Sequence, residues 1–185
     1  MTREPVPPFE LGPMPLGCSM EEVDSQFVHA PARLTFELAS RVEKWPTYLN
    51  HYRYVRFREK RSDGGGVVEM SANRPFMVKA GSRGLPPFNW PTWWVSEMSI
   101  DKAKPSIRFR HVGGITTGME VEWTFIAAPD GTHVRIVHLW NGPSWPVIGP
   151  FAAMYVIGPL FVHGIASRTL AGLAVVAEKR ARTQQ

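Results

Sequence analysis

Two histidines lie where their side chains could exchange hydrogen bonds or protons with a small molecule inside the protein. His111 follows Phe109 at a two-residue step, and His138 follows Ile136 in the same way. Because alternate side chains of a strand face the same side, both imidazoles are predicted to point inward. A histidine can bind or protonate a ligand carbonyl or enol near neutral pH, which cyclising a ketone-rich substrate requires. His111 and His138 are therefore candidate catalytic and ligand-binding residues; the alternative for each is a satisfied core histidine.

Five further side chains are candidates for contact with a ligand. Trp94, Trp123 and Trp140 fall on the predicted inner faces of three strands, where they could form flat walls for a ring, although core packing explains any one of them. Arg74 continues the alternating inward-facing positions of the strand predicted at 66–72. Its guanidinium would need a carboxylate or a ligand oxygen as a hydrogen-bond partner, unless the side chain reaches the solvent at the rim of the pocket. Tyr155 is a candidate from the helical side.

Motifs for other chemistries are missing from the sequence. There is no HExxH pattern, Cys18 has no second cysteine, and His133 and His138 alternate to opposite strand faces. Neither GxGxxG nor GxxxxGK[ST] occurs, and GSRG at 81–84 lacks the GxSxG pattern of serine hydrolases. We expect no metal, no nucleotide or other cofactor, and no serine hydrolysis.

Hydropathy patterns predict an α+β fold. Alternation indicates strands, and a proline followed by apolar residues at three- and four-residue steps indicates helices. The predicted elements are a strand at 22–28, two short helices within 29–49 broken at Trp45-Pro46, strands at 53–60, 66–72, 93–100, 107–112, 118–127 and 132–140, and a long helix from Pro159 to about Arg180. The proline- and glycine-rich stretch 74–92 is predicted to be a loop bordering the site, with at most a short edge strand in it.

The final helix should pack on the sheet. Its apolar positions recur at three- and four-residue steps and comprise Val162, Ile165, Thr169, Leu173 and Val176. One helix cannot fill the concave side of a strongly curved sheet of this size, so the remaining space is predicted to be a pocket.

Length and composition fit one domain. The chain has 185 residues, 44% of them hydrophobic, which supports one sizeable core. We expect a proline-rich arm at 1–21 and a single ligand-binding domain at 22–182. The single Cys18 excludes an intrachain disulfide, and the first residues lack an apolar run of signal-peptide length. These features predict a cytoplasmic protein.

The basic charge does not indicate nucleic-acid binding. The formal net charge is +5, but Arg56, Arg58 and Lys60 alternate with other residues as on the solvated face of a strand. The twenty residues at 147–166 form an uncharged segment long enough to span a bilayer, yet Gly149-Pro150 and Gly158-Pro159 interrupt it. We expect no nucleic-acid partner and no integral membrane span, while peripheral membrane contact stays open.

Four segments together resemble a known family. They are HAPARLTFELASRVEKWPTYL (29–49), FRHVGGITTGMEVEWTF (109–125), GTHVRIVHLW (131–140) and ASRTLAGLAVVAEK (166–179). Residues 22–178 resemble the START-like (SRPBCC) superfamily, particularly its polyketide cyclase/dehydrase and coenzyme-Q-binding branch. The resemblance implies a helix-grip fold, with a curved antiparallel sheet wrapped around the long C-terminal helix. Segments 74–92 and 147–166 depart from a typical member.

Two functions follow from these observations. The first is binding of a small hydrophobic ligand, such as a polyketide, an isoprenoid or quinone, or a lipid, in an internal aromatic-lined cavity. The alternative is a polyketide aromatase/cyclase or dehydratase acting on a poly-β-ketone in that cavity, without metal or nucleotide. Fold resemblance alone does not choose between them, and the sequence contains no decisive acid/base constellation.

Overall fold

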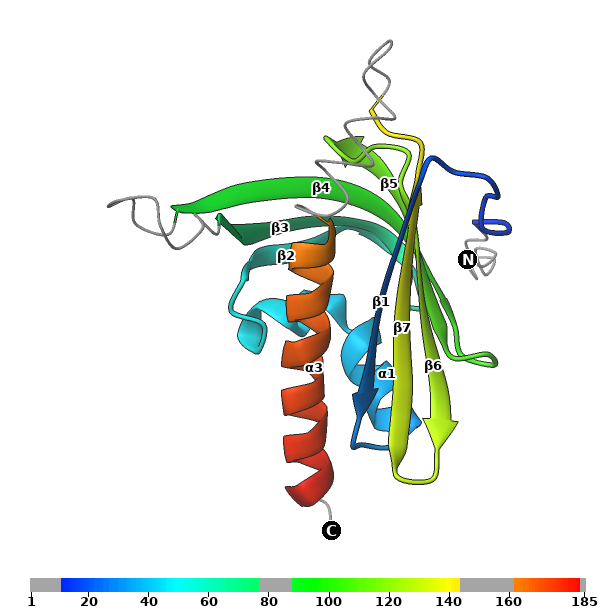
Figure 1. Ribbon diagram of the computed structural model, residues 1–185, viewed down its shortest axis with the longest axis vertical. Helices are drawn as coiled ribbons and strands as arrows, with labels where there is room; N and C mark the ends of the chain where they lie inside the picture. Colours follow the sequence, from blue (N-terminus) through cyan, green and yellow to red (C-terminus); the bar gives the residue numbers. More distant parts are fainter. Residues whose placement is uncertain (1–10, 77–87, 144–161, 184–185) are drawn as a thin grey trace, which may run out of the picture.

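A computed structural model describes residues 11–76, 88–143 and 162–183 of the chain. Seven strands and one long helix dominate the described part (Figure 1). In chain order the elements are β1 (Met20–Val28), α1 (Ala32–Ser40), the 3₁₀ helix η1 (Val42–Thr47), β2 (Tyr52–Lys60), β3 (Gly66–Phe76), β4 (Phe88–Asp101), β5 (Ser106–Gly114), β6 (Glu120–Ala128), β7 (Gly131–Trp140) and α3 (His163–Thr183).

The strands form one antiparallel sheet in the order β1-β7-β6-β5-β4-β3-β2. Each sequential pair from β2 to β7 is adjacent, and β1 joins the end strand β7, as short connections favour. Figure 1 shows β2, β3 and β4 passing across one end of α3, while β1, β7 and β6 run beside it. The sheet thus wraps around the helix, and the predicted helix-grip α+β fold is confirmed.

Irregular pairing accompanies the curvature of the sheet. The register between β2 and β3 shifts at Tyr52/Tyr54 and again at Phe57/Glu59. Between β4 and β5 it shifts at Val95/Ser96, so that Val112 has no partner in the register. An extra residue in one strand bends it and increases its twist, which turns the inner face of the sheet toward α3.

The core lies between the sheet and the two α-helices. Alternate strand residues such as Ile107 and Ile136 have no exposed surface, and neither does Leu173 of α3. Residues Leu38 and Ala39 of α1 are also buried in this core. The apolar face predicted for the final helix therefore packs on the sheet, because that contact removes its side chains from water.

The predicted loop at 74–92 is wrong at both of its ends. β3 continues to Phe76 and β4 begins at Phe88, and the two extensions pair in register, with Pro75 opposite Asn89 and Asn73 opposite Pro91. The pairing of β2 with β3 ends at Ala72, and that of β5 with β4 ends at Trp94. Each extension therefore has one unpaired edge, where proline removes no ladder hydrogen bond.

The two short helices after β1 are confirmed, but the break between them falls at Arg41 instead of Trp45-Pro46. Arg41 leaves the helical region with ψ 60°, and Pro46 lies inside η1. α3 reaches Thr183, three residues beyond the predicted end. The start predicted at Pro159 and most of the apolar segment 147–166 lie outside the described residues. No described helix is long and apolar enough to cross a membrane.

Arginine–carboxylate contacts cover the outer face of the sheet. Glu69, 7% exposed, accepts hydrogen bonds from Tyr54, Arg56 and Arg58 at 2.8–3.0 Å. Two of the basic residues expected on a solvated strand face are therefore paired with a neighbouring strand.

The outer face also holds the segment before β1. Arg108 Nη1 donates to the Gly12 carbonyl at 2.8 Å, and Arg110 Nη2 donates to the Leu11 carbonyl at 2.7 Å. β1 itself begins at Met20, inside the predicted arm of residues 1–21. The division into an arm and a domain stays a prediction.

Replacing Leu173 with alanine tests the packing of α3 on the sheet. Leu173 is fully buried, so truncation should lower the free energy of unfolding by about 2–5 kcal/mol through lost burial and a residual cavity. Val175→Ala is the matched control on the same helix, because Val175 is 66% exposed and should change stability by about 0.5 kcal/mol or less. Urea unfolding followed by circular dichroism measures both, and equal losses would contradict this packing.

Candidate functional site

A cavity of about 90 Å³ lies between the inner face of the sheet and the first turns of α3. Its lining comes from all of the strands except β1, together with η1, the β5–β6 connection and α3. The described lining residues are Trp45, Tyr52, Met70, Thr92, Trp94, Phe109, His111, Ile115, Thr116, Met119, Val121, Trp123, Ile136, His138, Val162, Ile165, Ala166 and Thr169. Apolar and aromatic groups predominate, with a few polar atoms among them.

The size of the cavity limits what it can enclose without rearrangement. A buried water needs roughly 10–15 Å³, and an apolar cavity of about 150 Å³ holds benzene. The cavity therefore suits one compact group. Pockets for drug-sized ligands are about 300–1,000 Å³, so a longer molecule would have to move side chains or extend out of the cavity.

His111 lies on β5 between an aromatic wall and a threonine. Its ring stacks on the Trp94 indole, with centroids 6.0 Å apart and planes inclined by 18°. Its Nδ1 shares a hydrogen bond with Thr116 Oγ1 at 2.7 Å, which holds the ring in place. One imidazole nitrogen is thus engaged by the protein, and the side chain is only partly buried because it faces the cavity.

His138 lies on β7, next to the same space, and is 8% exposed. Its Nδ1 is buried and finds no hydrogen-bond partner among the described residues. A buried polar atom left unpaired costs about 1–3 kcal/mol. A water or a ligand group that reached Nδ1 and paired with it would recover that cost.

Burial keeps both imidazoles neutral. It lowers the pKa of His111 to about 3, and burial together with the neighbouring His111 lowers the pKa of His138 to about 3. A neutral imidazole offers one donor and one acceptor nitrogen. Near pH 7 these residues can hydrogen-bond a ligand, but a group with a pKa of about 3 is a weak base, because proton transfer is most effective when the pKa is near the working pH.

A hydrogen-bond network around Thr169 of α3 lies at the cavity wall. Thr169 Oγ1 donates to the Ile165 carbonyl at 2.8 Å and lies 3.0 Å from His51 Nε2 and 3.3 Å from the Tyr52 hydroxyl. Since the threonine proton is used within the helix, His51 Nε2 and the Tyr52 hydroxyl act as donors to its oxygen. This network joins the start of β2 to α3.

Strand alternation did not reveal the contributions of Trp45, Tyr52 and Thr169 to the cavity wall. Each lies at the end of an element or on a helix that packs across the sheet, where a period of two gives no information. Trp45-Pro46 was interpreted only as a helix break. The available signal was a large aromatic residue within that break: Trp45 is 2% exposed, and its ring lies 5.6 Å from that of Trp123.

Of the five predicted site residues whose side chains are described, four line the cavity and one lies away from it. The cavity wall includes Trp94, His111, Trp123 and His138, and their contact with a ligand stays a prediction. Trp140 is not among the described lining residues, which corrects its predicted place: its indole Nε1 donates to the Thr117 carbonyl at 3.0 Å, so the ring packs beneath the β5–β6 connection.

Two predicted residues cannot be assigned to the cavity. Arg74 lies in β3 opposite Trp90, and its side chain is outside the described part. Tyr155 falls outside the described residues altogether. Among the described residues, the cavity itself gathers no group of three metal-ligating side chains.

Comparisons with solved structures show that other proteins share this fold. TTHA0849 from Thermus thermophilus is similar with a TM-score of 0.67 and 18% identity, covering 88% of this chain and 99% of that one. The Zhui aromatase/cyclase from Streptomyces sp. R1128 is similar with a TM-score of 0.68 and 18% identity, covering 87% and 94%. A START superfamily protein from Mycobacterium smegmatis has a TM-score of 0.57 and 17% identity, covering 89% and 99%.

A family model gives the more specific assignment. The model described as polyketide cyclase / dehydrase and lipid transport matches residues 28–157, more than half of the chain. The chain belongs to this family. No curated protein sequence is significantly similar to it. The resemblance noted from the sequence is thereby confirmed, and it supports ligand binding or polyketide cyclisation at the level of the family.

The neutral histidines predict a loss of stability in mild acid. Burial depresses the pKa of His51 to about 4 and that of His111 and His138 to about 3, against 6.5 normally, so the unfolded chain binds more protons below pH 6.5. The free energy of unfolding should fall as the pH drops from about 6.5 to 4.5, by at most about 1.4 kcal/mol per pH unit for each histidine.

Urea unfolding across this pH range measures the effect. His111→Gln and His138→Gln should each flatten the pH dependence, with His133→Gln at an exposed position as the matched control. If both cavity variants kept the slope of the parent protein, the folded protein would not hold these two imidazoles neutral in mild acid.

Proposed function

We propose that this protein binds a small, neutral, hydrophobic molecule in the cavity, with an aromatic or polyene portion between the tryptophan walls. A polyketide, an isoprenoid or quinone, or a lipid with a compact head belongs to this ligand class. A cytoplasmic location is part of the proposal.

The observation that carries the proposal is an apolar, aromatic cavity in which the polar atoms include two neutral imidazoles. Apolar walls favour a ligand by removing its surface from water, at about 25 cal/mol per Å². The unpaired Nδ1 of His138 favours a ligand with one hydroxyl or carbonyl group. No cationic side chain is found among the described lining residues at neutral pH, so these residues offer a carboxylate ligand no charged partner.

Polyketide cyclisation is the second candidate. The stack of His111 on Trp94 and the nearby unpaired nitrogen of His138 could orient a poly-β-ketone for ring closure. The low pKa of both histidines argues against efficient proton transfer, so orientation would have to provide most of the rate enhancement. Binding is therefore the better supported function.

A matched pair of ligands separates burial from hydrogen bonding. Both 1-naphthol and naphthalene are larger than the cavity and require the lining side chains to move. We expect 1-naphthol to bind more tightly than naphthalene, because only the hydroxyl can pair with a histidine. Trp123→Ala should weaken both ligands, by more than either histidine variant does, since it removes a cavity wall. His138→Gln should weaken 1-naphthol by about 2–10-fold, the value of one hydrogen bond, and leave naphthalene unchanged.

Isothermal titration calorimetry measures these affinities. Trp93→Ala is the matched tryptophan control, because Trp93 is 52% exposed and is not among the described lining residues. Equal losses in the Trp93 and Trp123 variants would place binding outside the cavity. Cyclisation of a poly-β-ketone by the parent that disappears in His111→Gln or His138→Gln, with ligand affinity kept, would establish the enzyme instead.

A further inference from the structure

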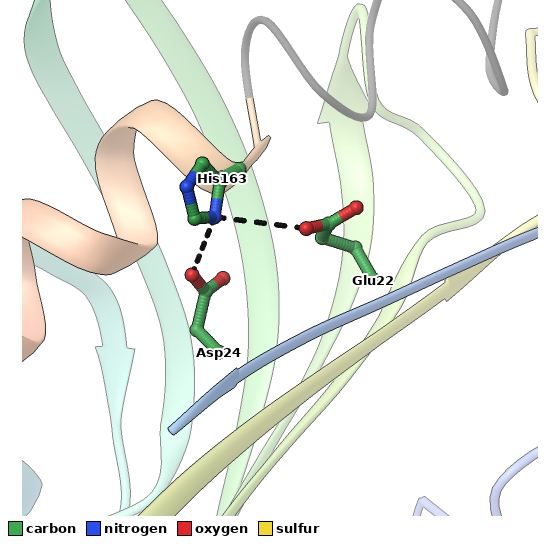
Figure 2. Close-up of side chains that lie close together, drawn as sticks. All are labelled: Glu22, Asp24 and His163. Carbon is green, nitrogen blue, oxygen red and sulfur yellow. Dashed lines mark ion pairs between the residues drawn. The ribbon is translucent and has the colours of Figure 1, made fainter. Parts of the chain in front are cut away.

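Two acidic residues of the edge strand β1 face the first turn of α3. Glu22 and Asp24 lie two positions apart, so both side chains point to the inner face of the sheet. His163 is the first residue of α3, and its Nδ1 is 2.7 Å from Asp24 Oδ1 and 3.6 Å from Glu22 Oε1. Figure 2 shows the two carboxylates and the imidazole converging between the strand and the helix.

The arrangement leaves one buried carboxylate oxygen without a partner. Asp24 is 5% exposed, and its Oδ2 has no hydrogen-bond partner among the described residues. A buried acidic oxygen beside a second carboxylate is costly unless a cation or a donor occupies the space between them.

We propose that Glu22, Asp24 and His163 form a binding site for a divalent transition-metal ion of the Zn²⁺ type. One ligand atom from each residue lies within 4.8 Å of the others, which small side-chain rotations can bring to a common ion. Zn²⁺ accepts carboxylate oxygens and imidazole nitrogens at about 2.0–2.2 Å. Three protein ligands leave a coordination position for water or another small ligand.

The two carboxylate charges of Glu22 and Asp24 support a cation at this position. A divalent cation compensates two carboxylates fully, whereas a protonated His163 compensates only one. It would also give the orphaned Asp24 Oδ2 a partner. Metal ions bind the deprotonated forms of these side chains, so any proton held in the contact between Asp24 Oδ1 and His163 Nδ1 is released to the solvent when the ion binds.

The site lies next to the proposed ligand cavity. Glu22 pairs with His138 across β1 and β7, and Asp24 pairs with Ile136; both partners line the cavity. Val162, next to His163, also lines it. An ion held by β1 and α3 would fix the first turn of the helix against the sheet and so stabilise one wall of the cavity.

The sequence patterns predicted no metal site, because known ligand motifs are read along the chain. These three ligands come from β1 and α3, which are adjacent in space but lie near opposite ends of the sequence, so no local spacing connects them. The alternative is that Asp24 and His163 form only an ion pair that ties the helix to the strand.

Calorimetric titration of the EDTA-treated, tag-free protein with Zn²⁺ distinguishes these possibilities. We expect one ion per chain, with heats that depend on buffer ionisation because protons are released. Asp24→Asn and His163→Gln should each weaken binding by about tenfold or more. A Zn²⁺ concentration 100 times the Kd should raise the Tm of the parent by about 5–10 °C and shift that of the His163→Gln protein far less.

The controls separate this site from other metal-binding groups. His133→Gln removes an exposed histidine next to Phe27 and should leave Zn²⁺ binding unchanged. His163 is 55% exposed, so its replacement should leave the fold intact, which the Tm of the metal-free variant checks. Absence of binding at about 100 µM Zn²⁺, a weak limit for a site with three protein ligands, or binding that survives His163→Gln, would leave only the ion pair.

Discussion

The packing of α3 on the concave face of the sheet is the contact on which the rest of the structure depends. Leu173 is fully buried in this contact, and Val162 begins the same apolar face next to the cavity. A helix covers a strip about 10 Å wide, whereas the curved sheet presents a broader surface. The helix therefore closes the core along its middle turns and leaves unfilled space beside its first turns, where the aromatic residues gather.

Burial in that space sets the chemistry of its polar groups. The desolvation that depresses the pKa of His111 and His138 to about 3 makes them poor proton carriers and good neutral hydrogen-bond partners. In the same environment His138 Nδ1 has no partner among the described residues, and a water or ligand group that paired with it would recover the free-energy cost of its burial. Stability in acid and preference for a neutral ligand thus have one cause.

Alternation in the sequence predicted the strands and the inward direction of His111, Trp123 and His138, because a strand face has a fixed period of two. It placed Trp140 too close to the cavity, since alternation gives the direction of a side chain but not its distance from the cavity along the strand. Beyond Ala72 the sequence predicted a loop with at most a short edge strand, whereas β3 and β4 continue to pair there, because an unpaired strand edge tolerates proline. Contacts between elements distant in the chain, such as Asp24 with His163, carry no local signal.

The central claim, that a neutral ligand is held between the sheet and the first turns of α3, is tested most directly by intermolecular nuclear Overhauser effects. Protein labelled with ¹³C and ¹⁵N would be saturated with 1-naphthol. The account predicts contacts from the ligand ring protons to Trp123, Val121 and Ala166, which line the cavity from the sheet and from the helix. Contacts confined to exposed groups such as Trp93 and Ile126, with none to these three residues, would contradict it.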